Sequence, residues 1–348
     1  MLNEESIRWE TVLENAREAL NPKCRVCPVC NGRACAGVTP GPGGKGTGKT
    51  FMRNYDYLHE RIRLQMDVLG EPFSPDTSIS LFGKKLSLPV LAAPIGMVSF
   101  SLSDKLNEYT YAKAVLEGMK MAGSLAITGG GAFDESFFGP LKALEEVNGE
   151  GIPNLKPWKQ ELLLERIRIT EKTGASAFVI DIDSAGLAHA GLSKNALERK
   201  SEEALAAIVL QSDMKLIVKG IMTPEAAIKA VRAGAYGIVV SNHGGRVMDE
   251  GLSTAEVLPE ISRAVRGKVQ VFVDGGVRSG ADVFKMLALG ADAVLIGRPY
   301  FVAAYGGGAQ GVSLYTQIIH NELSDVMCMT GCKTISDITE DKIRINSY

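Results

Sequence analysis

Tyr236-Gly237-Ile238-Val239-Val240 is an apolar run that leads directly into Ser241-Asn242-His243-Gly244-Gly245-Arg246. An unbroken, β-branched apolar run of this length predicts a strand that is buried on both faces. The glycines that follow permit a tight turn and the close approach of a ligand. His243 can move a proton, and Arg246 can bind a carboxylate. On these residues alone, an active site at a strand end and an ordinary surface turn are equally good interpretations.

The same unit of apolar run, turn and helix-like segment recurs from residue 87 onward, eight times in all. We expect strands at 88–93, 124–128, 152–155, 177–182, 215–218, 237–241, 269–273 and 293–296. We expect helices at 103–121, 134–147, 159–173, 195–211, 224–233, 253–266, 279–289 and 311–328. Buried strands joined by helices indicate an α/β protein with a parallel sheet. Eight units predict a closed (β/α)8 barrel, or TIM barrel, and the alternative is a doubly wound open sheet.

Polar residues follow these runs at the point where each run ends. They are Thr128, Asn154, Lys156, Asp181, Asp183, Lys219, His243, Arg246, Asp274, Arg278 and Arg298. In a (β/α)8 barrel the carboxyl ends of all strands meet at one mouth, where the active site lies. Each residue by itself also fits a loop cap or a solvated strand end. Their convergence on one mouth is what favours a functional site.

The last two strands predict a phosphate site. Glycines after them expose backbone amides near the starts of the next helices, and Arg278 and Arg298 add positive charge. This is the usual phosphate-binding arrangement of such barrels. A phosphate site in the same mouth as Lys219 and the His243/Arg246 pair suits a phosphorylated redox cofactor.

The composition is that of an ordinary soluble globular protein. The 348 residues are 45% hydrophobic and 22% charged, with a formal net charge of −2. So small a net charge lacks the excess of positive charge that is typical of proteins that bind nucleic acid or a membrane surface. No apolar run is long enough to span a bilayer, and the acidic start has no signal-peptide core. We therefore expect a cytoplasmic protein.

We expect residues 1–80 to form a helix at 4–20, a cysteine cluster and a glycine-rich flap that pack on a barrel domain at 81–348. The cluster consists of Cys24, Cys27, Cys30 and Cys35, all within twelve residues. This spacing suits metal or redox chemistry better than a disulfide framework. An iron–sulfur cluster, a zinc ion and reduced thiols on a loop all stay open as interpretations.

Gly43-Gly44-Lys45-Gly46-Thr47-Gly48-Lys49-Thr50 matches the phosphate-loop pattern G-x4-G-K-T of nucleotide-binding proteins. That pattern binds phosphate when a buried strand leads into the loop and a helix leaves it. Here the preceding stretch is rich in Cys, Pro and Gly, so the strand is missing. We therefore interpret the stretch as a flap near the active site.

Several longer motifs lie along the barrel region. They are Leu91-Ala92-Ala93-Pro94, Ile217-Val218-Lys219-Gly220-Ile221, Ser241-Asn242-His243-Gly244-Gly245-Arg246, Val273-Asp274-Gly275-Gly276-Val277-Arg278-Ser279-Gly280-Ala281-Asp282-Val283, Leu289-Gly290-Ala291-Asp292-Ala293-Val294, Ile296-Gly297-Arg298-Pro299 and Met329-Thr330-Gly331-Cys332. In these motifs, from about residue 80 to 335, the chain resembles the FMN-dependent α-hydroxy-acid oxidase/dehydrogenase family, which includes glycolate oxidase and lactate oxidase.

The resemblance implies a TIM barrel that binds FMN and oxidises a 2-hydroxy acid to a 2-oxo acid. His243, oriented by Asp183, would take the substrate hydroxyl proton while a hydride equivalent passes to flavin N5. Arg246 would bind the substrate carboxylate, and Lys219 would stabilise the anionic reduced flavin. Other residues implied to hold the flavin and its phosphate are Pro94, Ile95, Gly96, Thr128, Asn154, Asp181, Ser241, Asp274, Gly275, Gly276, Val277, Arg278, Gly297 and Arg298. By analogy with the family, a homo-oligomer, commonly a tetramer, is expected.

The chain departs from the family pattern around the substrate. Lys156 stands where the family usually has a tyrosine, and Asn154 where it has a glutamine. No arginine follows Asp183 in a shortened loop that contains His189, and the cysteine and glycine-rich stretches replace the N-terminal segment that usually supplies another tyrosine. Lys156 can act as a second cation for the substrate. The electron acceptor can be oxygen or another acceptor, reached through the cysteines if they bind a cluster.

Two alternatives stay open. An FMN barrel with non-redox chemistry, similar to a flavin-type isopentenyl-diphosphate isomerase, would need a diphosphate site and a metal. The sequence His243-Gly244-Gly245-Arg246 favours hydroxy-acid chemistry instead. A flavin- or metal-binding sensor without catalysis is the other alternative, and the joint presence of His243, Asp183, Arg246 and Lys219 argues against it.

Overall fold

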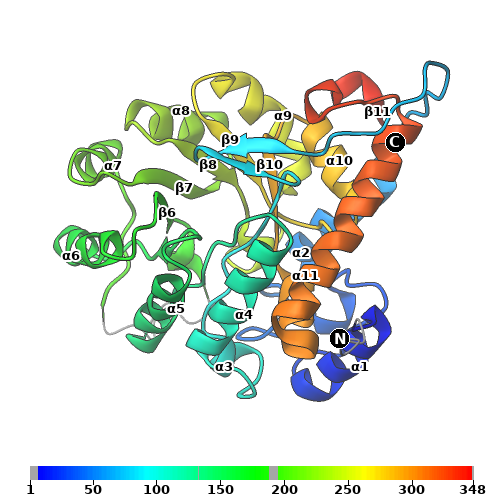
Figure 1. The fold of residues 1–348 in the computed structure, drawn as a ribbon. Helices are drawn as coiled ribbons and strands as arrows, with labels where there is room; N and C mark the ends of the chain where they lie inside the picture. Colours follow the sequence, from blue (N-terminus) through cyan, green and yellow to red (C-terminus); the bar gives the residue numbers. More distant parts are fainter. Residues whose placement is uncertain (1–6, 132, 188–194, 347–348) are drawn as a thin grey trace.

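Seven short parallel strands surround the centre of the molecule (Figure 1). The computed structural model describes residues 7–131, 133–187 and 195–346. The strands are β4 (Val90–Ala92), β5 (Asn154–Leu155), β6 (Ala177–Asp181), β7 (Lys215–Ile221), β8 (Gly237–Val240), β9 (Gln270–Val273) and β10 (Ala293–Ile296). They follow each other in the order β4-β10-β9-β8-β7-β6-β5, so the first strand pairs with the last.

The segment 124–128 closes the remaining gap between β4 and β5. The amide of Ile127 donates to the carbonyl of Ala92 at 2.9 Å, and the amide of Thr128 donates to the carbonyl of Ile152 at 2.8 Å. This expected strand is thus present as isolated bridges to both neighbours. The seven strands and this segment together close the barrel, which confirms the barrel prediction and excludes the doubly wound alternative.

Helices cover the outside of the barrel. They are α4 (Glu108–Met121), α5 (Glu135–Glu146), α6 (Gln160–Glu171), α7 (Glu202–Val209), α8 (Pro224–Arg232), α9 (Thr254–Val265), α10 (Gly280–Ala288) and α11 (Arg298–Met329). Short polar side chains cap the amino-terminal ends of five of them and fix where each begins. These caps are Asn107, Ser201, Thr223, Ser253 and Ser279.

Three of these helix starts differ from expectation by five residues or more. The helix expected at 103–121 begins only at Glu108, where Asn107 caps it. The helix expected at 195–211 begins only at Glu202, because Leu197 forms an antiparallel bridge with Trp158 and Ser201 caps the helix. The helix expected at 311–328 begins already at Arg298 and is interrupted at Gly308, whose φ of 56° and ψ of −143° are not helical. A glycine adopts that conformation without the strain that a side chain brings.

A hairpin absent from the sequence-based prediction closes the amino-terminal end of the barrel. It pairs β2 (Ile79–Leu81) with β3 (Lys84–Leu86). Leu81, Phe82 and Leu86 join the apolar cluster formed by the inward-facing residues of the strands. Phe82 stacks on Phe272 with ring centroids 6.2 Å apart. The mouth at the opposite end is therefore the open end of the barrel.

The N-terminal residues lie along one side of the barrel. Helix α1 (Trp9–Leu20) packs on α11, where a Cβ at Gly306 would lie 2.0 Å from the carbonyl oxygen of Val12. Of the helix expected at 4–20, the first residues lie outside the described residues. Helix α2 (Lys49–Asp56) reaches the mouth, and β1 (Ile62–Leu64) pairs with β11 (Ile343–Ile345) near the C-terminus.

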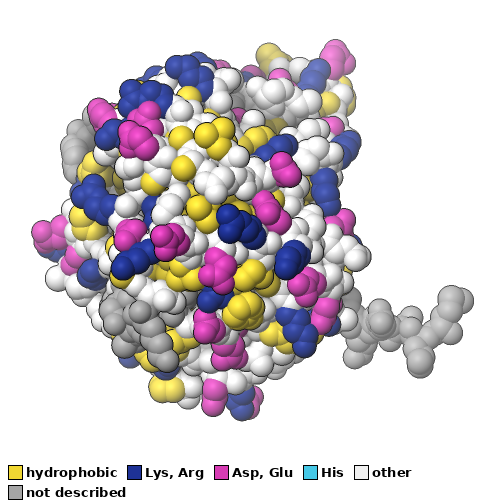
Figure 2. Space-filling view, turned by 90° about the vertical axis from the view of Figure 1, so that its left-hand side faces the viewer, with side chains coloured by type: hydrophobic (Ala, Val, Ile, Leu, Met, Phe, Trp, Pro, Cys, Tyr) yellow, Lys and Arg dark blue, Asp and Glu magenta, His cyan; other side chains and the backbone are white. Residues whose placement is uncertain are grey.

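Positive and negative side chains are interspersed on the face shown in Figure 2, with small hydrophobic patches between them. This mixture agrees with the formal net charge of −2. Within the described residues, no helix has both the length and the apolar character needed to cross a bilayer.

Phe82→Ala tests whether the hairpin at the amino-terminal end of the barrel stabilises the fold. Phe82 is 8% exposed, so its truncation leaves a cavity and should lower the free energy of unfolding by about 3 kcal/mol. The measurement is equilibrium unfolding in urea. Leu69→Ala, at a position that is 97% exposed, is the matched control and should change stability by less than about 0.5 kcal/mol. Equal stability of the two variants would show that the hairpin is dispensable.

Candidate active site

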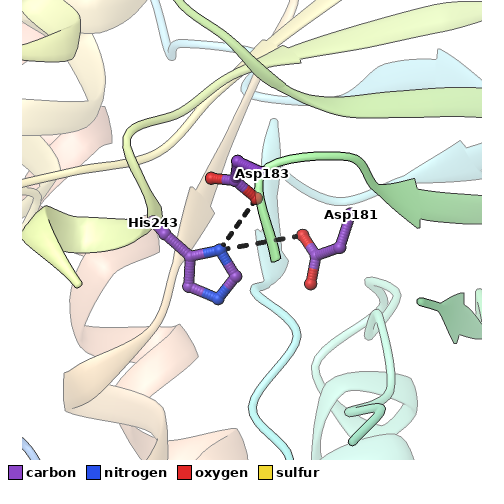
Figure 3. A group of neighbouring side chains, drawn as sticks. All are labelled: Asp181, Asp183 and His243. Carbon is purple, nitrogen blue, oxygen red and sulfur yellow. Dashed lines mark hydrogen bonds and ion pairs between the residues drawn. The ribbon is translucent and has the colours of Figure 1, made fainter. Parts of the chain in front are cut away.

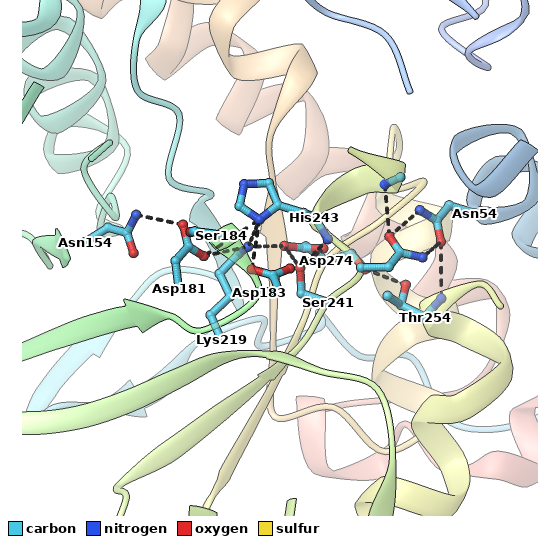
Figure 4. A network of polar contacts seen from close by, with 12 residues as sticks. Asn54, Asn154, Asp181, Asp183, Ser184, Lys219, Ser241, His243, Thr254 and Asp274 are labelled. Carbon is cyan, nitrogen blue, oxygen red and sulfur yellow. Dashed lines mark hydrogen bonds and ion pairs between the residues drawn. The ribbon is translucent and has the colours of Figure 1, made fainter. Parts of the chain in front are cut away.

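A buried carboxylate lies behind the wall of the mouth (Figure 4). Asp181 ends β6, and its side chain accepts hydrogen bonds from Asn154 at 3.0 Å and from Lys156 at 2.8 Å. Lys219, in register with it on β7, approaches to 3.0 Å. Burial opposes ionisation of Asp181, but Lys156 and Lys219 outweigh burial and hold its pKa well below the usual value. The carboxylate is therefore charged and shared by two ammonium groups.

Lys219 also faces other acids. Its ammonium lies 3.8 Å from Asp274, whose carboxylate accepts 2.8 Å hydrogen bonds from the hydroxyl of Ser241. Burial disfavours the charge on Lys219, yet Asp181 and the neighbouring carboxylates raise its pKa above the usual value. A buried, permanently positive group thus lies at the base of the mouth.

His243 lies beside Lys219, with its Nδ1 3.5 Å from the ammonium group. The same Nδ1 is 3.0 Å from a carboxylate oxygen of Asp183 and 4.0 Å from Asp181 (Figure 3). Since an ammonium cannot accept a proton, we assign the Nδ1 hydrogen to the bond with Asp183. The other ring nitrogen, Nε2, is then the one that can accept a proton from a ligand, and His243 lines the cavity at the mouth.

The turn after β8 holds the imidazole in place. His243 has a φ of 57°, in the left-handed region that few side chains adopt, and its amide donates to Ser241 at 3.0 Å. At Gly245 a Cβ would lie 2.4 Å from the amide nitrogen of Phe51 in α2. Only glycine permits this approach, so Gly245 allows α2 to pack directly on the turn.

A pair of amides joins α2 to the same turn. Asn54 and Asn242 each donate to the other at 2.8 Å, and both are buried. Asn54 also accepts from the amide of Thr254, whose hydroxyl donates to the carbonyl of Asp274. This network, on the right of Figure 4, connects the N-terminal segment to the loops after β8 and β9. No pattern in the sequence indicated Asn54.

The glycine-rich flap covers two of the three arginines that line the mouth. Arg246 donates to the carbonyls of Gly41 and Gly43, and Arg298 donates to the carbonyl of Pro42 at 2.8 Å. Burial lowers the pKa of Arg246 to about 10, so its guanidinium is positive at neutral pH. Both cations therefore stay charged, with flap carbonyls as their partners.

The flap does not act as a nucleotide phosphate loop. The amides of Thr47 and Lys49 donate to the carboxylate of Asp249, the second at 3.0 Å, and the ammonium of Lys49 pairs with Glu250 at 2.8 Å. Lys45 donates to backbone carbonyls, including that of Gly186 at 2.7 Å. The groups that would bind phosphate are occupied by the protein itself, as the missing strand led us to expect.

A cavity of about 950 Å³ opens between these elements. Predicted residues that line it are Pro94, Ile95, Gly96, Asn154, Lys156, Lys219, His243, Arg246, Asp274, Gly275, Gly276, Val277, Arg278, Gly297 and Arg298. Three buried polar atoms of its wall, Oγ of Ser101, Oδ1 of Asn154 and Nη2 of Arg278, have no hydrogen-bond partner within the described residues. Asn154 begins β5 and Arg278 follows β9, on opposite sides of the barrel. An acceptor on one side and a cationic donor on the other fit a heterocycle with N–H groups that is joined to a phosphate, as in FMN.

Four predicted site residues do not line this cavity. Asp181 and Asp183 lie behind it and act through Lys156, Lys219 and His243. Ser241 supports Asp274, and Thr128 is buried in the barrel wall with its amide bonded to Ile152. His189, singled out in the loop after β6, lies outside the described residues. Lining residues that the sequence did not indicate include Gly41, Leu187 and Phe301.

The four N-terminal cysteines are free and partly exposed. Within the described chain, the one group of three possible ligands whose atoms lie within 4.8 Å of one another is Asp181, Asp183 and His243. No three of the cysteine sulfurs are so close. The tetrahedral site that a zinc ion needs, with every sulfur about 2.3 Å from the metal, is therefore not formed by these cysteines. The zinc interpretation is therefore not supported by this arrangement.

Known proteins with similar sequences bear on this site. The peroxisomal (S)-2-hydroxyacid oxidase GLO3 of Arabidopsis thaliana is 50% identical over 133 residues, which cover 38% of this chain and 37% of that protein. The L-lactate oxidase of Lactobacillus jensenii is 43% identical over 169 residues, 49% of this chain and 41% of that protein. The matched region thus spans less than half the length of each of these relatives.

Solved structures match over nearly the whole chain. A mandelate oxidase variant with (S)-mandelic acid has a TM-score of 0.77 and 28% identity, covering 98% of this chain and 99% of that one. A variant with a C4a-OH-FMN adduct has a TM-score of 0.76 and 28% identity, covering 97% and 99%. The sequence also matches the family described as FMN-dependent dehydrogenase, over residues 41–197 and 188–345. The predicted resemblance is confirmed: this chain belongs to the FMN-dependent dehydrogenase family.

Proposed function

We propose that this protein oxidises a 2-hydroxy acid to the corresponding 2-oxo acid with FMN in the barrel mouth. The observation that carries the proposal is the imidazole of His243, whose Nδ1 is 3.0 Å from Asp183 and whose ring lines the cavity beside the buried Lys219. A base, a fixed cation and a carboxylate-binding guanidinium in one cavity are what this reaction needs. The relatives named hydroxy-acid, lactate and mandelate oxidases support the same reaction class.

The chemistry follows from the positions of the side chains. When bound, FMN supplies the acceptor for the hydride equivalent that leaves the substrate α-carbon. His243 removes the hydroxyl proton, and the negative charge of Asp183 stabilises the imidazolium that forms. Lys219 provides positive charge where the reduced ring would gain negative charge. Arg246 binds the carboxylate, and Lys156, which also lines the cavity, contributes a second cation.

The residues proposed to hold FMN divide into two groups. Pro94 to Gly96 and Asn154 would contact the ring, and the loops at 274–278 and 297–298 would hold the phosphate, all on the wall of the same cavity. The division into segments 1–80 and 81–348, the homo-oligomeric state and the cytoplasmic location stay part of the proposal. Oxygen is one possible acceptor of the electrons.

Bleaching of bound flavin tests the reaction class. Under anaerobic conditions, at least one member of a panel of 2-hydroxy acids should abolish the visible absorbance of the oxidised flavin. His243→Gln should retain flavin but react at least about 100-fold more slowly, because a general base typically contributes 10²–10⁴-fold. A wild-type flavin that no 2-hydroxy acid bleaches would disprove the proposed reaction. Readmitting air then shows whether oxygen is an acceptor.

Asp183→Asn tests the orienting role of that carboxylate. The amide keeps the shape but loses the charge that stabilises the imidazolium, so the rate of flavin reduction should fall about 100-fold or more. Stopped-flow absorbance measures this rate. Asp213→Asn, on the exposed surface, is the control and should leave the rate unchanged. An unchanged rate in Asp183→Asn would remove Asp183 from the mechanism.

Lys156→Met tests the second cation. Asp181 keeps Asn154 and Lys219 as partners in this variant, whereas the substrate loses a charge-assisted contact. The KM should rise about tenfold or more, as expected for the loss of about 1.5–3 kcal/mol, with flavin content unchanged. Lys159→Met, at an exposed position, is the matched control. If the KM of both variants equals that of the wild type, Lys156 does not contact the substrate.

A further inference from the structure

A second cavity lies next to the barrel mouth, and all four N-terminal cysteines line it. It is open to solvent and has a volume of about 1660 Å³. Cys24, Cys27, Cys30 and Cys35 are contributed by one loop between α1 and α2. Four thiols on the wall of one cavity are unusual unless they share a ligand, because thiols elsewhere serve mainly as small apolar groups in cores.

The backbone of this loop has a strained turn between its first two cysteines. Val26, between Cys24 and Cys27, has a φ of 46° and is 5% exposed. A β-branched residue rarely adopts this left-handed conformation, and such strain is concentrated at functional sites.

Two arginines lie on the same wall as the cysteines. Arg278 and Arg298 line this cavity, and Nη2 of Arg278 has no hydrogen-bond partner within the described chain. The wall therefore presents positive charge and an unsatisfied donor to a ligand that the thiols bind.

The separation of the sulfurs selects the type of ligand. No three of them lie within 4.8 Å of one another, which is too far apart for a single ion. A cubane cluster holds its thiolates farther apart, because each sulfur binds a different iron. We propose that Cys24, Cys27, Cys30 and Cys35 ligate a [4Fe–4S] cluster. Four cysteines supply one thiolate to each of the four irons.

The position of this cavity assigns the cluster a role. Pro42, Arg278, Arg298 and Phe301 line both this cavity and the barrel mouth, so the two share a wall. The cluster would accept electrons one at a time from the reduced flavin and pass them to an external one-electron carrier protein. Two electrons leave in two steps for each substrate oxidised, and two protons pass to solvent. This role rests on the proposed function, whereas the cluster itself does not.

Iron and acid-labile sulfide analysis of the full chain, purified without oxygen and then reconstituted with Fe²⁺ and sulfide, tests the cluster. We expect about four irons and four sulfides per chain and, after dithionite reduction, a low-temperature EPR signal. Cys27→Ser and Cys30→Ser should lose both while retaining flavin. Cys328→Ser, exposed on α11, should keep them. Wild type without iron and sulfide, with zinc alone, or with a cluster that survives both serine substitutions would overturn the proposal.

Anaerobic addition of a 2-hydroxy acid separates the cluster from its role. If flavin bleaches and the cluster signal appears, the electron route is supported. Bleaching with a cluster that only dithionite reduces would overturn the route and leave the cluster standing. If dithionite reduces the cluster but no hydroxy acid bleaches the flavin, the proposed function fails, and the route falls with it.

Discussion

The arrangement of the mouth depends on one buried carboxylate. Asp181 and Lys219 face each other because β6 and β7 pair in register, so the backbone hydrogen bonds of the barrel place the charge pair. Lys156 shares the same carboxylate at 2.8 Å. Removing one partner of a buried ion pair typically costs about 3–5 kcal/mol, since the remaining charge is then left without compensation. The strand pairing that helps to close the barrel therefore also sets the positions of the charged groups in the site.

Much of this architecture follows from local sequence. Buried parallel strands have a continuous apolar pattern, and polar residues at their ends must meet at one mouth once the barrel closes. This reasoning found His243, Lys219 and the loop at 274–278. It could not find the hairpin at 79–86 or the amide pair of Asn54 with Asn242, because those depend on contacts between segments far apart in the chain. The strand at 124–128 was expected in full, but only its two bridges form.

The glycine-rich flap matches a phosphate-binding motif, but its amides bind a side chain of the protein instead of a phosphate. The glycine-rich stretch does present backbone amides to an anion, as its pattern requires, but the anion is the carboxylate of Asp249. The carbonyls at 41–43 meanwhile satisfy two arginines of the mouth. The N-terminal segment thus completes the cavity wall that the strand-end loops begin. A substrate carboxylate that reaches Arg246 competes with these carbonyls.

The paired amides of Asn54 and Asn242 also limit the chemical lifetime of the site. Each supplies the donor that the other needs, so deamidation of either one would replace an NH₂ group with a carboxylate oxygen and leave two acceptors facing each other. Asn54 is 1% exposed and Asn242 is 7% exposed, which restricts the access of water to both. Ageing of the protein at this pair would weaken one of the contacts that hold α2 to the catalytic turn without any change in the barrel itself.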